Sequence, residues 1–311
     1  MRASPTPRRR IRAGSPRALL ACAFLVLLGS AWGLSPREPD PQEPVQVRSH
    51  PVAGPVHWIE GRGGNLGVSA GEDGLLLIDD QFEDLAPQIQ AELDKLSKAP
   101  LRFVVNTHWH GDHTGGNAVF GRKAPIVAQE NVRERLQGKS AGRGPSEPTP
   151  PHALPVVTYL QSVSLHLNGE EVRVVHYPGA HTDGDSVVFF MRSNVVHMGD
   201  LFFSGRFPFV DLDSGGSVRG VERSVREILD VLADDVKIIP GHGPMSTKAD
   251  LRRYRDMLAD AIARVEKALA AGKSVEEMKE GNVLAGYEEW AWGFVGMERF
   301  VETLVRDLGR R

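Results

Sequence analysis

Short apolar runs alternate with glycine-rich turns from residue 45 to about residue 80. Runs of this length, separated by turns such as GRGGN and AGEDG, are typical of β-strands. They read VQVRSH, VHWIE, NLGVSA and GLLLIDD. Apolar residues then recur at 85, 89, 93 and 96, a spacing that predicts a helix. LRFVVN (101–106) is a short apolar run that predicts a buried strand.

The rest of the chain repeats this order of strands followed by a helix. APIVA (124–128) predicts a strand and QENVRERLQ (129–137) a helix. After them come the strand-like runs TYLQSVSLHL, EVRVVHY, SVVFFM and NVVHMG, a predicted helix at 218–232, and the strand KIIP (237–240). Two β-rich blocks, each closing on a helix, predict a two-part sandwich of mixed sheets covered by helices.

Two stretches permit more than one interpretation. The Pro- and Gly-rich loop at 138–155 is either a mobile surface excursion or a flap on the substrate side. An apolar stripe from Leu251 to Leu269 is typical of a helix packed on the core. Four aromatic residues follow the stripe, and we expect them to pack in the core, with a dimer surface or a pocket wall as the alternative. They are Trp290, Trp292, Phe294 and Phe300.

The first 33 residues have the layout of a secretory signal peptide. Six arginines and no acid precede a twelve-residue apolar run at 18–29, and Ala31-Trp32-Gly33 offers small residues for cleavage. Twelve apolar residues are too few to cross about 30 Å of hydrocarbon, which disfavours a membrane anchor. We therefore expect an exported protein, periplasmic or secreted, with a signal peptide at 1–33 and a flexible, proline-rich leader at 34–51.

Removal of the signal peptide changes both the charge and the cysteine content. The six arginines take the formal charge from −3 to −9, and the only cysteine, Cys22, is lost with them. An acidic chain disfavours a nucleic-acid partner, and no stable membrane span is expected after cleavage. Because no thiolate is left, any metal site in the mature chain must use histidine and carboxylate ligands.

The densest cluster of such residues is NTHWHGDHTGG at 106–116. In an extended segment His108 and His110 point to the same side, since side chains alternate along a strand. We expect Gly111 to permit a sharp turn, so that Asp112 and His113 approach a second point nearby. Zinc accepts imidazole nitrogen and carboxylate oxygen, so one segment can begin two zinc sites.

Three further candidates lie where an apolar run meets a glycine-containing turn. His181 lies in PGAHTDGD, Asp200 ends NVVHMGD, and His242 lies in PGHG after KIIP. Loops beyond strand ends are the usual position of ligands at the rim of a sheet. We therefore expect these three residues to complete the two sites.

The ordered motifs HWHGDH, PGAHTDGD, HMGD and IIPGHG resemble those of the metallo-β-lactamase superfamily, over residues 52–250. The resemblance implies an α/β fold, a four-layer αββα sandwich with two zinc ions per chain at one edge of the sheets. It implies that His108, His110 and His181 hold the first zinc, with Asp200 as a bridging carboxylate. It also implies that Asp112, His113 and His242 hold the second zinc and that Asp79 supports the metal-binding loop from behind. We expect residues 251–311 to form a helical extension packed on this domain.

Two features narrow the subgroup. The principal β-lactamases of this fold often carry a cysteine at the second metal, which the mature chain lacks, and others have no bridging acid, which Asp200 provides here. The ligand set is therefore more similar to glyoxalase II and related thioesterases or lactonases. Two zinc ions lower the pKa of a shared water towards about 7, and Asp112 would orient the resulting hydroxide towards a carbonyl carbon.

The leading hypothesis is an exported dinuclear zinc hydrolase that cleaves an ester, thioester, lactone or amide of a small-molecule substrate. A β-lactamase-type hydrolase, a mono-iron sulfur dioxygenase and a non-catalytic metal-binding protein are the alternatives. The stretch LFFSGRFPFVDLDSGGS follows Asp200, which places it beside the pocket. Phe203 and Phe207 would then form an apolar wall, unless they pack in the core, and Arg206 would meet a substrate carboxylate. The sequence specifies neither the substrate nor the oligomeric state.

Overall fold

The computed structural model describes residues 46–138 and 148–309. The predicted signal peptide, residues 34–45 of the predicted leader and residues 139–147 of the 138–155 loop lie outside this part of the chain. Within it no helix has the length and hydropathy required to cross a bilayer.

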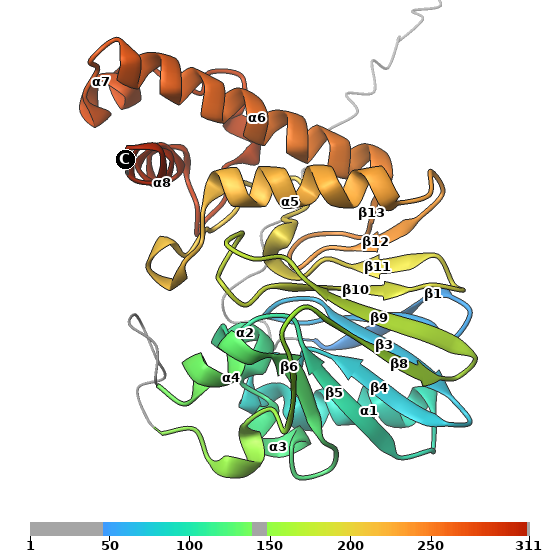
Figure 1. Ribbon diagram of the computed structural model, residues 1–311. Helices are drawn as coiled ribbons and strands as arrows, with labels where there is room; N and C mark the ends of the chain where they lie inside the picture. Colours follow the sequence, from blue (N-terminus) through green and yellow to red (C-terminus); the bar gives the residue numbers. More distant parts are fainter. Residues whose placement is uncertain (1–45, 139–147, 310–311) are drawn as a thin grey trace, which may run out of the picture. The chain divides into compact units, whose positions relative to one another are not determined.

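The strands of the described residues form two sheets (Figure 1). One contains β1 (Arg48–Ala53), β2 (Val56–Glu60), β3 (Leu66–Gly71), β4 (Gly74–Ile78), β5 (Leu101–Asn106), β6 (Ile126–Gln129) and β7 (Val157–Tyr159). The other contains β8 (Ser162–Leu167), β9 (Glu170–His176), β10 (Ser186–Phe190), β11 (Val195–His197), β12 (Lys237–Ile239) and β13 (Ser246–Thr247). The first sheet has the order β1-β2-β3-β4-β5-β6-β7 and the second the order β13-β12-β11-β10-β9-β8.

Both sheets are mixed, as the sequence predicts. In the first, β1 to β4 pair antiparallel and β4 to β7 pair parallel. In the second, β11 and β12 are parallel and the other pairs antiparallel. Because parallel strands end at the same edge, the residues that follow β5, β11 and β12 are brought to one rim.

The helices cover the outer faces of the two sheets. The α-helices are α1 (Ala86–Leu96), α2 (Gly111–Thr114), α3 (Asn117–Phe120), α4 (Glu130–Leu136), α5 (Val218–Val231), α6 (Lys248–Ala270), α7 (Val275–Glu280) and α8 (Met297–Leu308). Short 3-10 helices are η1 (Glu83–Leu85), η2 (Pro151–Ala153), η3 (Gly199–Leu201), η4 (Leu212–Ser214) and η5 (Glu288–Trp290). In Figure 1, α1 lies against the first sheet and α5 and α6 lie over the second.

Strand β4 illustrates how the alternation of side chains builds these layers. Leu75 and Leu77 belong to the apolar cluster between the first sheet and α1. Leu76 and Ile78, pointing the other way, belong to the cluster between the two sheets, together with Val188 of β10. A third cluster joins the outer face of the second sheet to α5, α6 and α8. The four-layer αββα arrangement is therefore confirmed.

Two boundaries differ from the expected ones. Strand β1 begins at Arg48, so residues 48–51, which we expected to belong to the leader, pair with β2. Helix α6 begins at Lys248, three residues before the expected extension, because Thr247 and Asp250 form a capping box at its first turn.

A carboxylate of α8 caps the start of α5. Oδ2 of Asp307 accepts a hydrogen bond from the backbone N–H of Val218 (2.8 Å) and another from Oγ of Ser217 (3.1 Å). The first N–H groups of a helix have no partner inside the helix, and an acid there also interacts favourably with the helix dipole. Asp307 thus fixes the end of α8 to the helix that covers the second sheet.

We predict that Asp307→Ala lowers the free energy of unfolding by about 1 kcal/mol, the typical cost of a lost cap. Urea denaturation measured at equilibrium checks this value. The control is Asp230→Ala, an exposed acid at the other end of α5, for which we expect a change within about 0.5 kcal/mol. Equal effects of the two substitutions would contradict the capping role.

Candidate metal centre

The seven predicted ligands come from four segments of the chain and converge on one rim of the sandwich. His108 and His110 follow β5, Asp112 and His113 lie in α2, and His181 lies between β9 and β10. Asp200 lies in η3 after β11, and His242 follows β12. They form two groups, and within each group the candidate ligand atoms lie within 4.8 Å of one another.

The first group contains His108, His110, His181 and Asp200. His108, His181 and Asp200 are buried, and His110 is partly exposed. The Nε2 atoms of His108 and His181 are buried and form no hydrogen bond within residues 46–138 and 148–309. A buried nitrogen without a partner costs free energy unless something binds its lone pair, so this group fits a metal ion.

The second group contains Asp112, His113 and His242. Oδ2 of Asp112 lies 3.3 Å from Nε2 of His242 and 3.7 Å from Nε2 of His113. The Nε2 atoms of His113 and His242 lie 3.5 Å apart. Two imidazole nitrogens and a carboxylate oxygen are the ligands that zinc accepts, so this group fits a second metal ion.

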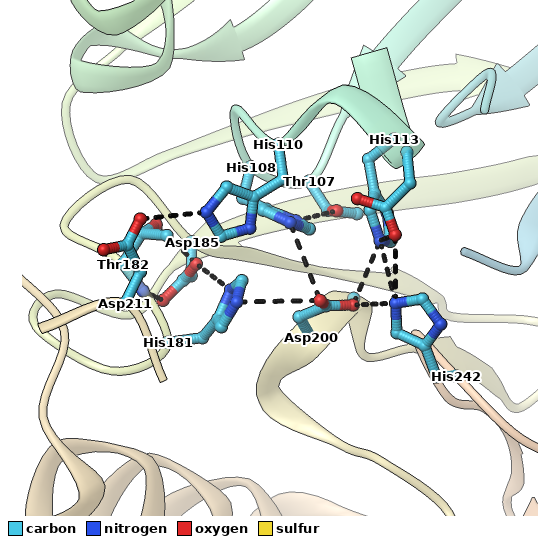
Figure 2. A network of polar contacts seen from close by, with 12 residues as sticks. Thr107, His108, His110, His113, His181, Thr182, Asp185, Asp200, Asp211 and His242 are labelled. Atoms are coloured by element: carbon cyan, nitrogen blue, oxygen red, sulfur yellow. Dashed lines mark hydrogen bonds and ion pairs between the residues drawn. The ribbon is translucent and has the colours of Figure 1, made fainter. Parts of the chain in front are cut away.

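Asp200 lies between the two groups and faces both (Figure 2). Its Oδ2 lies 3.6 Å from Nε2 of His181 and 3.8 Å from Nε2 of His108. Its Oδ1 lies 3.1 Å from Nε2 of His113 and 3.4 Å from Nε2 of His242. One oxygen is directed to each group, which is the geometry required of a bridging carboxylate.

Groups behind the histidines determine which ring nitrogen faces the centre. Nδ1 of His113 lies 2.8 Å from Oδ2 of Asp79, which holds a proton on this nitrogen and directs Nε2 to the centre. Asp79 also accepts hydrogen bonds from the N–H and hydroxyl of Thr107, both at 2.7 Å. The Thr107 oxygen then lies 3.1 Å from Nδ1 of His108, which leaves its Nε2 free as well.

Two further carboxylates lie beside histidines of the first group and are absent from the predicted site, and of these only Asp211 is within hydrogen-bonding geometry. Oδ2 of Asp211 lies 3.0 Å from Nε2 of His110, which directs the Nδ1 side of that ring to the centre. Oδ1 of Asp185 lies 3.4 Å from Nδ1 of His181. The acids in VDLDSGGS and HTDGD are the sequence signal that could have identified Asp211 and Asp185. Their spacing alone does not distinguish a metal ligand from a carboxylate that contacts a ligand.

The expected role of Gly111 is wrong. Its backbone begins helix α2 with an ordinary negative φ, and a Cβ added there meets no atom within 4 Å. The close approaches lie elsewhere. A Cβ on Gly64 would lie 2.1 Å from the His113 ring, and one on Gly241 would lie 2.2 Å from Oδ1 of Asp200. These two glycines, and not Gly111, leave room for the second group.

The centre is strongly coupled electrostatically when no metal is bound. Burial opposes ionisation of Asp200, but the positive charges of His113 and His242 outweigh it and lower the pKa of that carboxyl. Burial lowers the pKa of His242, yet the Asp200 and Asp112 carboxylates overcome this effect and raise the pKa to about 9. Burial likewise opposes ionisation of Asp112, and the neighbouring His113 lowers its pKa to about 2.

A pocket of about 1000 Å³ opens onto both groups, and His110, Asp112, Asp200 and His242 line it. Phe203 and Arg206 also line it. Phe207 does not, because its ring is buried and stacks on Phe300 at 4.5 Å between centroids. Among the C-terminal aromatics, Trp290 and Phe300 pack in the core as expected, whereas Trp292 and Phe294 form part of the pocket wall.

A family model described as the metallo-beta-lactamase superfamily matches residues 60–245. The chain belongs to the metallo-beta-lactamase superfamily. The match covers the strands that carry all seven predicted ligands and ends before α6. The C-terminal helices α6, α7 and α8 therefore lie outside it.

Relatives within the superfamily differ in their named activities. The beta-lactamase-like protein 2 homolog of Drosophila melanogaster is 32% identical over 175 residues, 54% of this chain and 54% of the relative. The linear primary-alkylsulfatase of a Pseudomonas species is 24% identical over 272 residues, 72% of this chain and 51% of the relative. The chain thus spans about half the length of these two relatives.

Among solved structures, the inverting sec-alkylsulfatase Pisa1 from Pseudomonas sp. superposes with a TM-score of 0.64 at 17% identity. The superposition covers 85% of this chain and 51% of the sulfatase. At this identity the likeness shows the fold alone.

We predict that zinc binding to this superfamily member releases protons and weakens as the pH falls. Histidine must be neutral to bind metal, and the pKa of His242 in the metal-free protein is about 9. Below that pH, His242 loses a proton on binding, so the affinity falls by up to about tenfold per pH unit for each proton released. Chelator competition at pH 6, 7 and 8 measures how steeply the zinc affinity changes with pH. We expect this pH dependence to be weaker in His242→Ala. An affinity independent of pH would refute the coupling.

We also predict that Asp211→Asn weakens metal binding about tenfold or more, in line with the usual effect of losing the carboxylate behind a histidine ligand. The amide oxygen of Asn still accepts the N–H of Ser214, which Asp211 accepts through Oδ1, so the local turn is preserved. Asp235→Asn is the matched control, since Asp235 is exposed and bonds only Asn194. If both variants bind zinc as the wild type does, Asp211 does not position His110.

Proposed function

We propose that the protein is an exported dinuclear zinc hydrolase that cleaves a carbonyl-type bond (ester, thioester, lactone or amide) of a small-molecule substrate. The observation that carries the proposal is the Asp200 carboxylate, which directs one oxygen to each of two histidine groups. The candidate ligands are imidazole nitrogens and carboxylate oxygens, both of which zinc accepts.

The residues divide into two groups of ligands with one shared acid. His108, His110 and His181 would hold the first ion and Asp112, His113 and His242 the second, with Asp200 in common. When bound there, zinc supplies Lewis acidity and lowers the pKa of a water molecule from 15.7 to about 7.

Among the candidate ligands, Asp112 is the residue best placed to accept a hydrogen bond from a water molecule in the pocket. Its side chain is 30% exposed and lines the pocket, whereas that of Asp200 is only 4% exposed. With a pKa of about 2 it is ionised at neutral pH, so its oxygens accept a hydrogen bond from an attacking water and hold it towards the pocket. The aromatic side chains around it exclude bulk water and strengthen this interaction.

We predict that the purified protein contains two zinc ions per chain and that His110→Ala lowers kcat/KM at least about a hundredfold, since a ligand with no substitute nearby is lost. Metal analysis and a panel of ester, thioester, lactone, β-lactam and sulfate-ester substrates make the measurement. The named activity of the linear primary-alkylsulfatase is the reason to include sulfate esters.

His166→Ala is the control for this experiment, because His166 is exposed on β8 and takes no part in either group. We expect it to keep wild-type zinc content and activity. One iron per chain in place of two zinc ions would support sulfur dioxygenation instead. A protein without transition metal, or full activity in His110→Ala, would contradict the proposal.

A further inference from the structure

The C-terminal region contributes a wall to the pocket that the family-matched residues 60–245 do not supply. Trp292 and Phe294 follow η5 and line the pocket. The Trp292 indole N–H donates to the carbonyl of Phe207 (3.0 Å), and the N–H of Phe207 donates to the carbonyl of Trp290 (2.8 Å). Two hydrogen bonds therefore fix this segment to the loop that follows Asp200.

The wall is aromatic and continuous. The ring of Phe294 lies 5.7 Å from that of Trp292 and 5.4 Å from that of Phe209. Phe294 is 50% exposed, an unusual position for a phenylalanine that has apolar neighbours to pack against. Trp58, Phe82 and Trp109 line the pocket too. Pockets of about 300–1,000 Å³ with such walls enclose drug-sized apolar groups.

In the part of the chain that the structure describes, Arg206 lines the pocket without a charged partner of its own. Two other charged residues in the lining are already paired, Glu60 with His50 at 2.9 Å and Arg62 with Asp84 at 2.8 Å. The guanidinium carbon of Arg206 lies 5.0 Å from the centroid of the Trp292 ring. The backbone N–H of Arg206 donates to the carbonyl of Phe203, but within residues 46–138 and 148–309 its guanidinium forms no ion pair and no hydrogen bond.

The position of Arg206 relates it to the metal centre. Trp292, on which Arg206 stacks, also lies 6.3 Å from the ring of His242, at an interplanar angle of 33°. A guanidinium over the face of an aromatic ring does not use its N–H donors in that contact, so they stay available for a bidentate oxyanion. An anion paired with Arg206 would therefore lie in the pocket that His242 also lines, next to the aromatic wall.

We infer that the substrate is an organic anion with an aromatic body, whose carboxylate-type group pairs with Arg206 and whose rings pack on Trp292 and Phe294. The place of the bond to be cleaved rests on the proposed function, whereas the binding of the anion by Arg206 does not. The body occupies the aromatic wall, and the bond to be cleaved is then held near Asp112 and the two histidine groups.

Calorimetric titration of the zinc-loaded protein with 4-phenylbutyrate and its neutral amide tests the binding. We expect the wild type to bind the acid at least about tenfold more tightly than the amide, since charge-assisted hydrogen bonds to a guanidinium are strong. Arg206→Gln loses most of this preference and Arg206→Lys retains part of it. The control is Arg226→Gln, an exposed arginine of α5 paired with Glu222, which keeps the whole preference.

Trp292→Ala weakens the binding of both probes about fivefold or more, whereas Trp292→Phe retains most of it, because the lost contact is an aromatic surface. Zinc content and near-ultraviolet circular dichroism of every variant confirm that the fold and the centre are intact. An acid preference that is unchanged in Arg206→Gln, or equally lost in Arg226→Gln, overturns the inference.

A kinetic measurement separates this inference from the proposed function. Two 4-nitrophenyl esters of equal chain length are compared, one whose acyl chain ends in a carboxylate and one whose chain ends in a methyl group. If neither is hydrolysed but the acid preference in binding depends on Arg206, carbonyl hydrolysis is contradicted and the anion site stands. If both are hydrolysed with equal kcat/KM in the wild type and in Arg206→Gln, hydrolysis stands and the anion site is refuted.

Discussion

The buried carboxylate of Asp200 is the interaction on which the rest of the centre depends. Four histidine Nε2 atoms lie 3.1–3.8 Å from its two oxygens. A buried charge of this kind is costly unless opposite charge surrounds it, and protonated imidazoles or metal ions supply that charge. The positive φ of Gly199 (49°) and the absence of a side chain at Gly241 allow the carboxylate to reach this position.

The outer carboxylates follow from the same constraint. Each imidazole can present a lone pair to the centre only if its other nitrogen holds the proton, and Asp79 and Asp211 stabilise that tautomer for His113 and His110. Asp79 does so from a strained backbone, with a φ of 58°. Strain of this kind persists where surrounding bonds hold it, and here the backbone N–H of Asp79 donates to the carbonyl of Val105.

Much of this architecture is predictable from the sequence because it depends on local periodicity. The alternation in GLLLI separates two apolar layers, and the run LRFVVN predicts β5 at its observed bounds. The seven ligand candidates stand out because histidine and aspartate rarely gather at strand ends without a chemical reason. His108 and His110 belong to one group, as the expected period of two predicts, although residues 107–109 form bends after β5 and not a strand.

The other features depend on distant contacts that no local pattern reveals. Asp211 meets His110 across 101 positions, and Trp292 reaches the pocket from beyond the matched family region. Gly64 is required by the His113 ring, which folds against it from another loop. Phe203 and Phe207 belong to one aromatic run and both are buried, yet Phe203 stacks on His242 and lines the pocket, whereas Phe207 stacks on Phe300.

The central claim is that one carboxylate is shared by two metal ions. Anomalous diffraction at the zinc absorption edge, from crystals of the zinc-loaded protein, measures this most directly. We expect two peaks of similar height, one among His108, His110 and His181 and the other among Asp112, His113 and His242, with an Asp200 oxygen within about 2.2 Å of each. A single peak, or two peaks of which only one contacts Asp200, would contradict the account.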